Sequence, residues 1–299
     1  MTSAVTTTPT WTVRSVVQWT TDDLKKRGVP TARLDAELIV SYALKIDRVR
    51  LIVAGDRELE PAELEAIRAL VVRRRSFEPI AYLVGKREFF GRDFKVDRRV
   101  LVPRPDTEIL VQVALDRLRG RELGGRIVDL CTGSGCVATT LKCELLTLTV
   151  DAIDLSPDAL AVARDNAARL GAVWNVRFAV GDLFGPLGAP SPRYDLIVSN
   201  PPYIPSDELA TLQADVRDHE PRLALDGGRD GLDLVRRIVD GAPRWLRAGG
   251  ALALEIGHGE ADSTRALMTT RGFSDVSIAR DYAGIDRVVS GVFVGSPRR

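Results

Sequence analysis

Cysteine and histidine are scarce in this 299-residue sequence, which contains three cysteines and two histidines. Cys131, Cys136 and Cys143 are odd in number, lack a Cys-x-x-Cys spacing, and have only His219 and His258 as additional ligands. This pattern argues against both a disulfide framework and a zinc site. We therefore expect a cytoplasmic protein without a bound metal.

A charge imbalance and a long apolar run are also absent. The 42 Lys and Arg residues against 41 Asp and Glu residues leave a formal charge of +1, which gives no reason to expect a nucleic acid or a membrane as the main partner. No apolar run reaches the ~20 residues of a membrane-spanning helix. Residues 1–10 lack the charged and apolar segments of a signal peptide, so we expect a frayed tail there.

The sequence does contain enough apolar residues, 45% of the chain, to fill at least one sizeable core, and its length favours two domains. In residues 1–83 the apolar residues recur at helical spacing after Pro30 and after Pro61, without a strand pattern, which predicts a small helical bundle. Residues 84–103 resemble a β-hairpin around a Gly91-Arg92 turn, and they would link the bundle to the next domain.

An α/β pattern occupies residues 104–299. A helix is expected to start near Asp106, and strands and helices alternate from Arg126 onward. Because helices fall between most of the strands, we predict a mainly parallel sheet that is covered on both faces. The seven predicted strands are residues 126–130, 149–153, 175–180, 194–199, 251–256, 274–280 and 287–294.

A glycine turn follows the first of these strands. Residues 131–135, Cys-Thr-Gly-Ser-Gly, would expose backbone N–H groups at the edge of the sheet where open α/β folds bind ligands. By itself, the pair Gly133 and Gly135 is equally consistent with a glycine turn that binds no ligand. Asp154, at the tip of the second strand, is placed to accept both ribose hydroxyls of a nucleoside, although it would also suit the cap of the next helix.

The nature of the ligand is narrowed by the residues around this turn. A dinucleotide and S-adenosylmethionine both fit a glycine turn followed by a ribose-binding acid, but Gly135 is followed by Cys-Val-Ala, without the third glycine typical of pyrophosphate binding. Asp129 suits the positive amino-acid end of S-adenosylmethionine. Asp182 and Leu183, after the third strand, suit an adenine amine and ring, unless Asp182 is an ordinary turn residue.

The stretch Ser199-Asn200-Pro201-Pro202-Tyr203 must end the fourth strand, because proline has no N–H for the ladder. If Asn200 Oδ1 and the Pro201 carbonyl each accept one N–H of a planar NH₂ group, they hold the nitrogen lone pair toward a methyl carbon. Tyr203 offers a flat face for stacking. Such positioning requires no general base. The alternative is a proline-terminated strand in which Asn200 caps the loop.

These motifs, in this order, resemble those of class I S-adenosylmethionine-dependent methyltransferases, and Asn-Pro-Pro-Tyr resembles the branch that acts on planar NH₂ groups. Leu101–Glu108, Leu-Val-Pro-Arg-Pro-Asp-Thr-Glu, is similar to the signature of the HemK/PrmC protein-glutamine N5-methyltransferases. The segments Tyr82–Phe89 and Val216–Leu225 resemble the same family. The similarity runs from about Leu34 to the C-terminus.

The resemblance implies a Rossmann-like class I methyltransferase fold and methylation of the glutamine in the Gly-Gly-Gln loop of class I peptide chain release factors. By position, the methyl donor would be held by Asp129, Cys131, Thr132, Gly133, Ser134, Gly135, Asp154, Asp182, Leu183 and Asn200. The glutamine amide would be held by Asn200, Pro201, Pro202 and Tyr203, with Asn200, Pro201 and Tyr203 as the catalytic residues. We expect the N-terminal bundle to bind the protein substrate away from the loop.

Two residues depart from the family pattern, and two lie outside the general motifs. Cys131 stands where glycine is usual, so its side chain is expected to point away from the ligand, and Leu183 stands where an aromatic residue is frequent. Arg104 and Glu108 would either cap the helix near Asp106 and pair across it, or line the donor pocket or the substrate channel.

Several rival functions share parts of this pattern. A DNA adenine-N6 methyltransferase shares Ser-Asn-Pro-Pro-Tyr, but it needs a positive groove and a region that reads base edges. A ribosomal-protein glutamine methyltransferase would differ after Arg104. A nicotinamide oxidoreductase and a binding protein without transfer activity are more distant alternatives.

Overall fold

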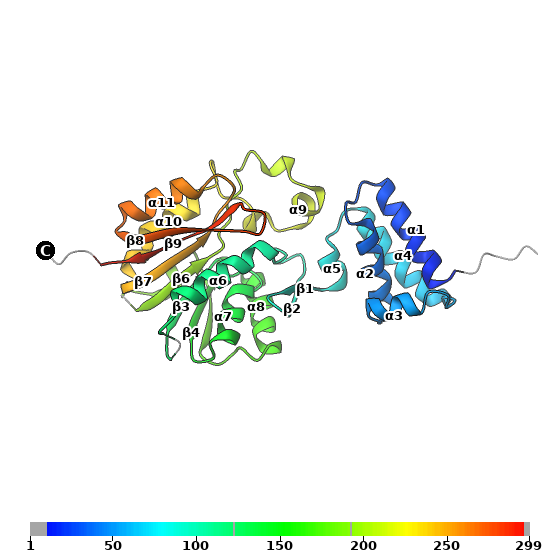
Figure 1. Ribbon diagram of the computed structural model, residues 1–299, viewed down its shortest axis with the longest axis horizontal. Coiled ribbons are helices and arrows are strands. Elements are labelled where there is room, and N and C mark those ends of the chain that lie inside the picture. Colours follow the sequence, from blue (N-terminus) through cyan, green and yellow to red (C-terminus); the bar gives the residue numbers. More distant parts are fainter. Residues whose placement is uncertain (1–10, 122, 192, 296–299) are drawn as a thin grey trace, which may run out of the picture. The chain divides into compact units, whose positions relative to one another are not determined.

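The computed structural model describes residues 11–121, 123–191 and 193–295, and the tail predicted at residues 1–10 lies outside this part. The chain divides into two compact units (Figure 1). The helical unit comprises Met1–Gly85 together with Gln213–His219, and the sheet unit comprises Lys86–Leu212 together with Glu220–Arg299. Each unit has its own buried apolar core.

The helical unit confirms the predicted bundle. Its helices are α1 (Val13–Lys26), α2 (Ala32–Leu44), α3 (Arg48–Val53), α4 (Pro61–Arg75), α5 (Ile80–Val84) and α9 (Ala214–His219). Pro61 stands at the start of α4, where its missing N–H costs nothing. Ile39 of α2 and Ile67 of α4 pack in one buried cluster, and the buried ion pair of Arg74 with Asp35, at 2.7 Å, joins the same two helices.

Helix α9 joins the helical unit although it is distant in sequence. The ring atom Nε2 of His219 lies 2.7 Å from the carbonyl oxygen of Ser76, just after α4. The sequence boundaries of 1–83, 84–103 and 104–299 assign this segment to the methyltransferase domain. Because six residues carry too little periodicity to indicate a packing partner, only the structure groups α9 with the bundle.

The sheet unit is built on seven strands in the order β5-β4-β3-β6-β7-β9-β8. These strands are β3 (Arg126–Leu130), β4 (Thr149–Asp154), β5 (Val176–Val180), β6 (Tyr194–Ser199), β7 (Leu246–Glu255), β8 (Phe273–Arg280) and β9 (Asp286–Phe293). The strand β9 runs antiparallel to both of its neighbours, and the other pairs are parallel. This confirms the predicted Rossmann-like, mainly parallel sheet.

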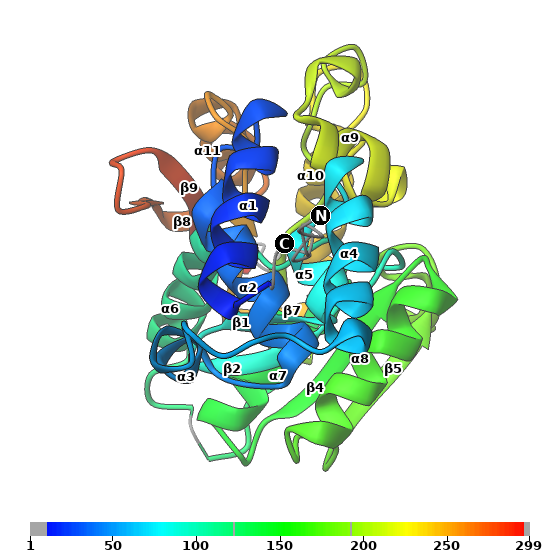
Figure 2. The ribbon, with the colours of Figure 1, turned by 90° about the vertical axis from the view of Figure 1, so that its right-hand side faces the viewer.

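Helices cover both faces of the sheet, as predicted. They are α6 (Glu108–Arg117), α7 (Cys136–Glu144) and α8 (Pro157–Arg169) on one face, and α10 (Asp233–Gly241) and α11 (Ala261–Thr270) on the other (Figures 1 and 2). Leu110 of α6 and Leu141 of α7 share one buried cluster, while Ile238 of α10 and Met268 of α11 share another. The strands between these clusters are therefore apolar on both sides.

The hairpin predicted between the two domains consists of β1 (Lys86–Phe89) and β2 (Arg92–Lys95). Phe89 and Phe94 are buried in the same cluster as α6. The Asn166 side chain in α8 accepts from the Lys95 N–H at 2.7 Å and donates to the Lys95 carbonyl at 3.0 Å. The hairpin is thus packed into the sheet unit.

One strand boundary differs clearly from the sequence prediction. Strand β7 begins at Leu246, whereas the sequence predicted a start at residue 251, after Gly249-Gly250. Gly249 has φ +76°, and the register between β6 and β7 shifts after the pair Tyr194 and Leu246. An irregularity that glycine permits therefore lies inside the strand, before the start that the sequence predicted.

Candidate active site

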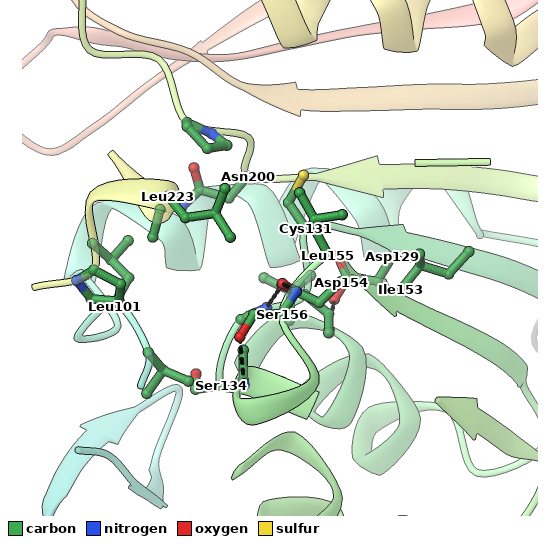
Figure 3. A pocket seen from close by; sticks show the side chains of 18 of the residues that line it. Leu101, Asp129, Cys131, Ser134, Ile153, Asp154, Leu155, Ser156, Asn200 and Leu223 are labelled. Atoms are coloured by element: carbon green, nitrogen blue, oxygen red, sulfur yellow. Dashed lines mark hydrogen bonds between the residues drawn. The ribbon is translucent and has the colours of Figure 1, made fainter. Parts of the chain in front are cut away.

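A cavity of about 220 Å³ opens in the sheet unit where β3, β4 and β6 end (Figure 3). Eleven of the predicted site residues line it, and they are Arg104, Asp129, Cys131, Thr132, Gly133, Ser134, Asp154, Asp182, Leu183, Asn200 and Pro202. Gly135, Pro201 and Tyr203 are not among the lining residues. Most of the expected donor-binding positions therefore lie around one cavity, at the carboxyl ends of parallel strands, where this class of sheet binds ligands.

The glycine turn is held by the strand next to it. The Gly133 N–H donates to Asp154 Oδ2 at 2.8 Å, which joins the turn after β3 to the tip of β4. Gly135 has φ +76°, and a Cβ atom there would lie 2.9 Å from Cβ of Ala163 in α8. The second glycine is therefore required both by the backbone conformation and by close packing against α8.

Asp154 points its carboxylate into this turn (Figure 3). Its second oxygen, Oδ1, accepts from the Ser156 N–H at 2.9 Å. Ser156 is the N-cap of α8, because its side chain accepts from the Ala159 N–H at 3.1 Å. The alternative that Asp154 caps this helix is therefore wrong. Burial raises the pKa of the Asp154 carboxyl, although hydrogen bonds from the backbone of Ser156, Gly133 and Leu155 oppose that rise.

Asp129 lies at the end of β3, beneath the turn. Its Oδ2 atom accepts from the Thr132 hydroxyl at 2.6 Å and from the Ala138 N–H at 3.2 Å. Burial raises the pKa of this carboxyl to about 7, and the hydrogen bond from Thr132 opposes the rise. A positive group next to Asp129 would favour its ionised form.

The far end of the cavity carries Asp182 and Leu183. The carboxylate of Asp182 pairs with Arg237 of α10 at 2.6 Å, and Leu183 is buried with φ +47°. Cys131 also has a positive φ, +58°, in a position where glycine is the usual solution. Cys131 packs against a buried apolar cluster while it lines the cavity, so the direction of its thiol relative to a ligand stays a prediction.

Asn200 enters the cavity from the end of β6 (Figure 3). Its Nδ2 atom donates to the Thr107 hydroxyl at 3.3 Å. Thr107 ends the short 3₁₀ helix η1 (Pro105–Thr107), so this hydrogen bond joins two segments that are distant in sequence. The alternative from the sequence was that Asn200 caps its own loop, which would be a local contact. An amide that donates through Nδ2 on one side has its oxygen available on the other.

Tyr203 is held behind the cavity. Its hydroxyl lies 3.5 Å from Oε1 of Glu255, the last residue of β7. Burial and the nearby carboxylate of Glu255 raise the pKa of the Tyr203 hydroxyl, so it stays protonated near neutral pH. The expected stacking of this ring on an acceptor amide stays a prediction.

The Arg104 guanidinium pairs with Glu220 at 2.7 Å, and the Glu220 side chain is buried. Glu108 instead accepts from the Phe90 N–H in the hairpin turn at 2.8 Å. The segment after Glu220 contributes Leu223 to the cavity, opposite the glycine turn (Figure 3). The structure therefore brings the segment around Arg104 and the segment after Glu220 together at one side of the cavity.

Several lining or adjoining residues escaped the sequence prediction. Leu101 and Thr107 stand inside the family-like stretch Leu101–Glu108, which marked the segment without assigning them roles. Leu223 likewise stands inside the family-like segment Val216–Leu225, which did not assign it a role. Glu255 has no local signal, because it is an ordinary acidic residue at the end of a strand. Their participation depends on which strands and loops become neighbours.

The chemistry of the cavity suits a cationic nucleoside ligand. Its lining includes the carboxylates of Asp129, Asp154 and Asp182, and Arg237 is already paired with Asp182. Carboxylates at these positions would repel a pyrophosphate but attract an ammonium or a sulfonium group. The residues present therefore fit S-adenosylmethionine better than a dinucleotide.

Known proteins resemble this chain over most of its length. Residues 15–85 match the family described as PrmC N-terminal domain, and residues 105–228 match the methyltransferase small domain. A release factor glutamine methyltransferase of Geobacter sulfurreducens is 47% identical over 281 residues, which cover 94% of this chain and 96% of the relative. One from Bordetella pertussis is 44% identical over 270 residues, which cover 90% and 97%.

A solved methyltransferase from Pyrococcus furiosus has a TM-score of 0.50 at 20% identity, and the match covers 77% of this chain and 98% of that chain. This likeness supports the fold alone. The sequence relatives show more, because their identity is above 40% over 90% or more of this chain. The chain belongs to the family of release factor glutamine methyltransferases.

Proposed function

We propose that the cavity binds S-adenosylmethionine beside the side-chain amide of a glutamine, and that the methyl group is transferred to N5 of the glutamine in the Gly-Gly-Gln loop of class I peptide chain release factors. Family membership makes the chain a protein-glutamine methyltransferase. The observation that carries the residue assignment is the Asn200 amide, whose nitrogen is bonded to Thr107 and whose oxygen is therefore available for an acceptor NH₂ group.

The donor side of the cavity is the surface formed by residues 129–135, Asp154, Asp182 and Leu183. When bound, S-adenosylmethionine supplies a methyl group attached to a positively charged sulfur. Asp154 is proposed to accept the ribose hydroxyls while it keeps the Gly133 N–H in place. Asp129 would face the amino group, and Asp182 with Leu183 would contact the adenine.

The acceptor side is the surface formed by Thr107, Asn200, Pro201, Pro202 and Tyr203. Asn200 Oδ1 and the Pro201 carbonyl are proposed to accept the two N–H groups of the glutamine amide, which localises the nitrogen lone pair. The two prolines fix the direction of that carbonyl and donate no competing hydrogen bond. The methylated nitrogen becomes acidic and loses one proton to water, so the acceptor side requires no general base.

Arg104 is proposed to form the wall of the substrate channel. Its pairing with the buried carboxylate of Glu220 fixes the direction of its guanidinium, and Leu223 of the next segment lines the same cavity. A charged group held by such a pair positions an incoming peptide backbone better than a free arginine side chain does.

The substrate assignment is tested with methyl-labelled S-adenosylmethionine and purified release factor. We expect label on a factor with the natural Gly-Gly-Gln loop, and none on a factor whose loop glutamine is replaced by alanine. Duplex DNA and ribosomal proteins serve as competing acceptors. Equal labelling of the two factors, or labelling of DNA instead, would overturn the assignment.

The helical unit is proposed to bind the release factor away from the loop. Helix α3 supports this role, because its Val49 and Ile52 side chains, which are three residues apart on one helix, are 72% and 74% exposed. The variant Ile52→Asp should raise KM for the intact factor and leave KM for a short glutamine-loop peptide unchanged. Leu146→Asp, at a similarly exposed residue of the sheet unit, is the matched control and should change neither. An unchanged KM for intact factor in Ile52→Asp would remove α3 from the contact.

A further inference from the structure

The orientation of the Asn200 amide must be fixed by its partners, because its oxygen and nitrogen ends have nearly the same shape. Only the orientation with Oδ1 toward the acceptor can hold an NH₂ group, since the reversed amide would oppose donor to donor. The Nδ2 atom donates to the Thr107 hydroxyl at 3.3 Å. The question is why Thr107 accepts here, since a hydroxyl can also donate.

The answer lies in the second partner of Thr107. Thr107 is only 2% exposed, and a buried hydroxyl proton normally has an acceptor in the protein or in ordered water. Glu255, at the end of β7, is 1% exposed, and its Oε2 atom has no hydrogen-bond partner within direct bonding distance among the described residues. Thr107 is among the groups that lower the pKa of the Glu255 carboxyl, as a hydroxyl close to a carboxylate does. The unsatisfied acceptor of Glu255 and the proton of Thr107 therefore complement each other.

We propose that Glu255 is a positioning residue that, when ionised, accepts a hydrogen bond from the Thr107 hydroxyl, leaves the Thr107 oxygen as the acceptor for Asn200 Nδ2, and so presents Asn200 Oδ1 to the substrate amide. A carboxylate can only accept, which gives the series of hydrogen bonds one direction. This inference rests on the proposed function, because it assigns Asn200 Oδ1 to the acceptor amide. Glu255 does not line the cavity and acts through Thr107.

The groups that face Glu255 set its charge. Burial raises its pKa to about 7, and Thr107, Arg287 and Tyr203 oppose the rise while Asp106 adds to it. Arg287 of β9 pairs with Asp106 at 3.2 Å, so its charge is shared. Cys136 of α7 also faces this carboxylate. The Glu255 carboxyl therefore changes its charge near neutral pH, whereas the pKa values of Tyr203, Cys136 and Arg287 are all raised and these groups stay protonated there.

Protonation of Glu255 reverses the direction of the hydrogen bonds. A neutral carboxyl can donate to the Thr107 oxygen, and Thr107 is then free to donate to Asn200, which favours the amide orientation with Nδ2 toward the substrate. The wild-type kcat should therefore fall as the pH is lowered through about 7. The donor affinity should not follow the same group, because Asp129 and Asp154 on the donor side do not touch Glu255.

The experiment compares Glu255→Gln, Thr107→Val and Thr107→Ser with the wild type, using methyl transfer to release factor and donor binding by calorimetry. We expect kcat to fall about tenfold in Glu255→Gln and Thr107→Val, as for the loss of one well-placed hydrogen bond. The serine variant keeps the hydroxyl and should restore most of kcat. The donor Kd should stay within about twofold in all three variants, and Glu255→Gln should lose the kcat change near pH 7.

A second readout does not depend on the substrate. In nuclear magnetic resonance spectra of the free protein, the Asn200 side-chain NH₂ protons should exchange slowly in the wild type and in Thr107→Ser, and faster in Thr107→Val and Glu255→Gln. A Glu255→Gln variant whose NH₂ exchange rate, kcat and pH profile equal those of the wild type would overturn the inference. If slow exchange follows the predicted pattern but no release factor is labelled, the proposed function fails while the role of Glu255 stands.

Discussion

The donor side and the acceptor side of the cavity differ in how their polar groups are held. On the donor side, Asp154 and Gly133 come from neighbouring strand ends, and the backbone N–H of Gly133 donates to the Asp154 carboxylate at 2.8 Å. On the acceptor side, Asn200 and Thr107 are 93 residues apart, and their contact joins two side chains. Backbone groups fix a shape that many nucleosides fit, whereas oriented side chains select the chemistry of one acceptor group. Binding and transfer are therefore expected to respond to different substitutions.

The largest effect should come from Asn200→Ala on the acceptor side. We expect kcat to fall by about 10² to 10³, as when one donor of an oxyanion hole is removed. The donor Kd should stay within about twofold, because Asp129, Asp154 and the glycine turn are intact. Single-turnover methyl transfer and calorimetric binding of the donor measure the two quantities. A parallel loss of donor affinity would mean that the two sides are not separable.

The converse substitution is Asp154→Ala on the donor side. Loss of a charged hydrogen-bonding partner should weaken donor binding by about 10 to 100-fold, while kcat at saturating donor changes much less. Asp182→Ala is the control, because the Asp182 side chain is 54% exposed and already paired with Arg237. We expect a smaller loss there. Equal losses in the two variants would contradict the central place given to Asp154.

The glycine turn offers a test of packing on the donor side. Gly135→Ala places a Cβ atom 2.9 Å from Cβ of Ala163 in a left-handed conformation, and it should lower the free energy of unfolding by about 2 kcal/mol. Gly133→Ala is the matched control, because its Cβ has no neighbour within 4 Å, and it should cost only about 1 kcal/mol. Chemical denaturation of both variants measures the difference, and equal costs would show that Ala163 moves aside.

The smallest effect is the pH dependence of donor binding through Asp129. Its folded pKa of about 7 lies above the ~3.9 of an unfolded aspartate, so the stability that it contributes is present below about pH 4 and is lost as the pH rises through 7. A cationic donor favours the ionised form, so donor binding should tighten about fivefold from pH 6 to pH 8. In Asp129→Asn this dependence should disappear, and its persistence would assign it to another group.

The two sides also differ in how far the sequence predicted them. The donor side follows from a glycine turn and acidic strand tips, whose places in a parallel sheet are fixed by the alternation of strands and helices. The link of Asn200 to Thr107, and the nearby Glu255, depend on β6 and β7 being neighbours and on η1 lying beside them. Spacing along the chain carries no information on such contacts, so Thr107 and Glu255 received no role.

The fold shows the same limit at a larger scale. The strands were predicted within one or two residues except at β7, which begins at Leu246 and not at residue 251, so that Gly249 lies within the strand. Helix α9 packs with the helical unit although it follows β6 by only 14 residues. Periodicity identifies elements, because it reports which face is buried, but it does not identify the partner that buries a short helix.

The most direct test of the acceptor geometry is a crystal structure of the enzyme with S-adenosylhomocysteine and a glutamine-loop peptide. We predict that the glutamine NH₂ group lies within hydrogen-bonding distance of both Asn200 Oδ1 and the Pro201 carbonyl, with Asn200 Nδ2 still bonded to Thr107. A complex in which these two oxygens face solvent, or in which a carboxylate contacts the glutamine nitrogen, would contradict the proposed role of the acceptor side.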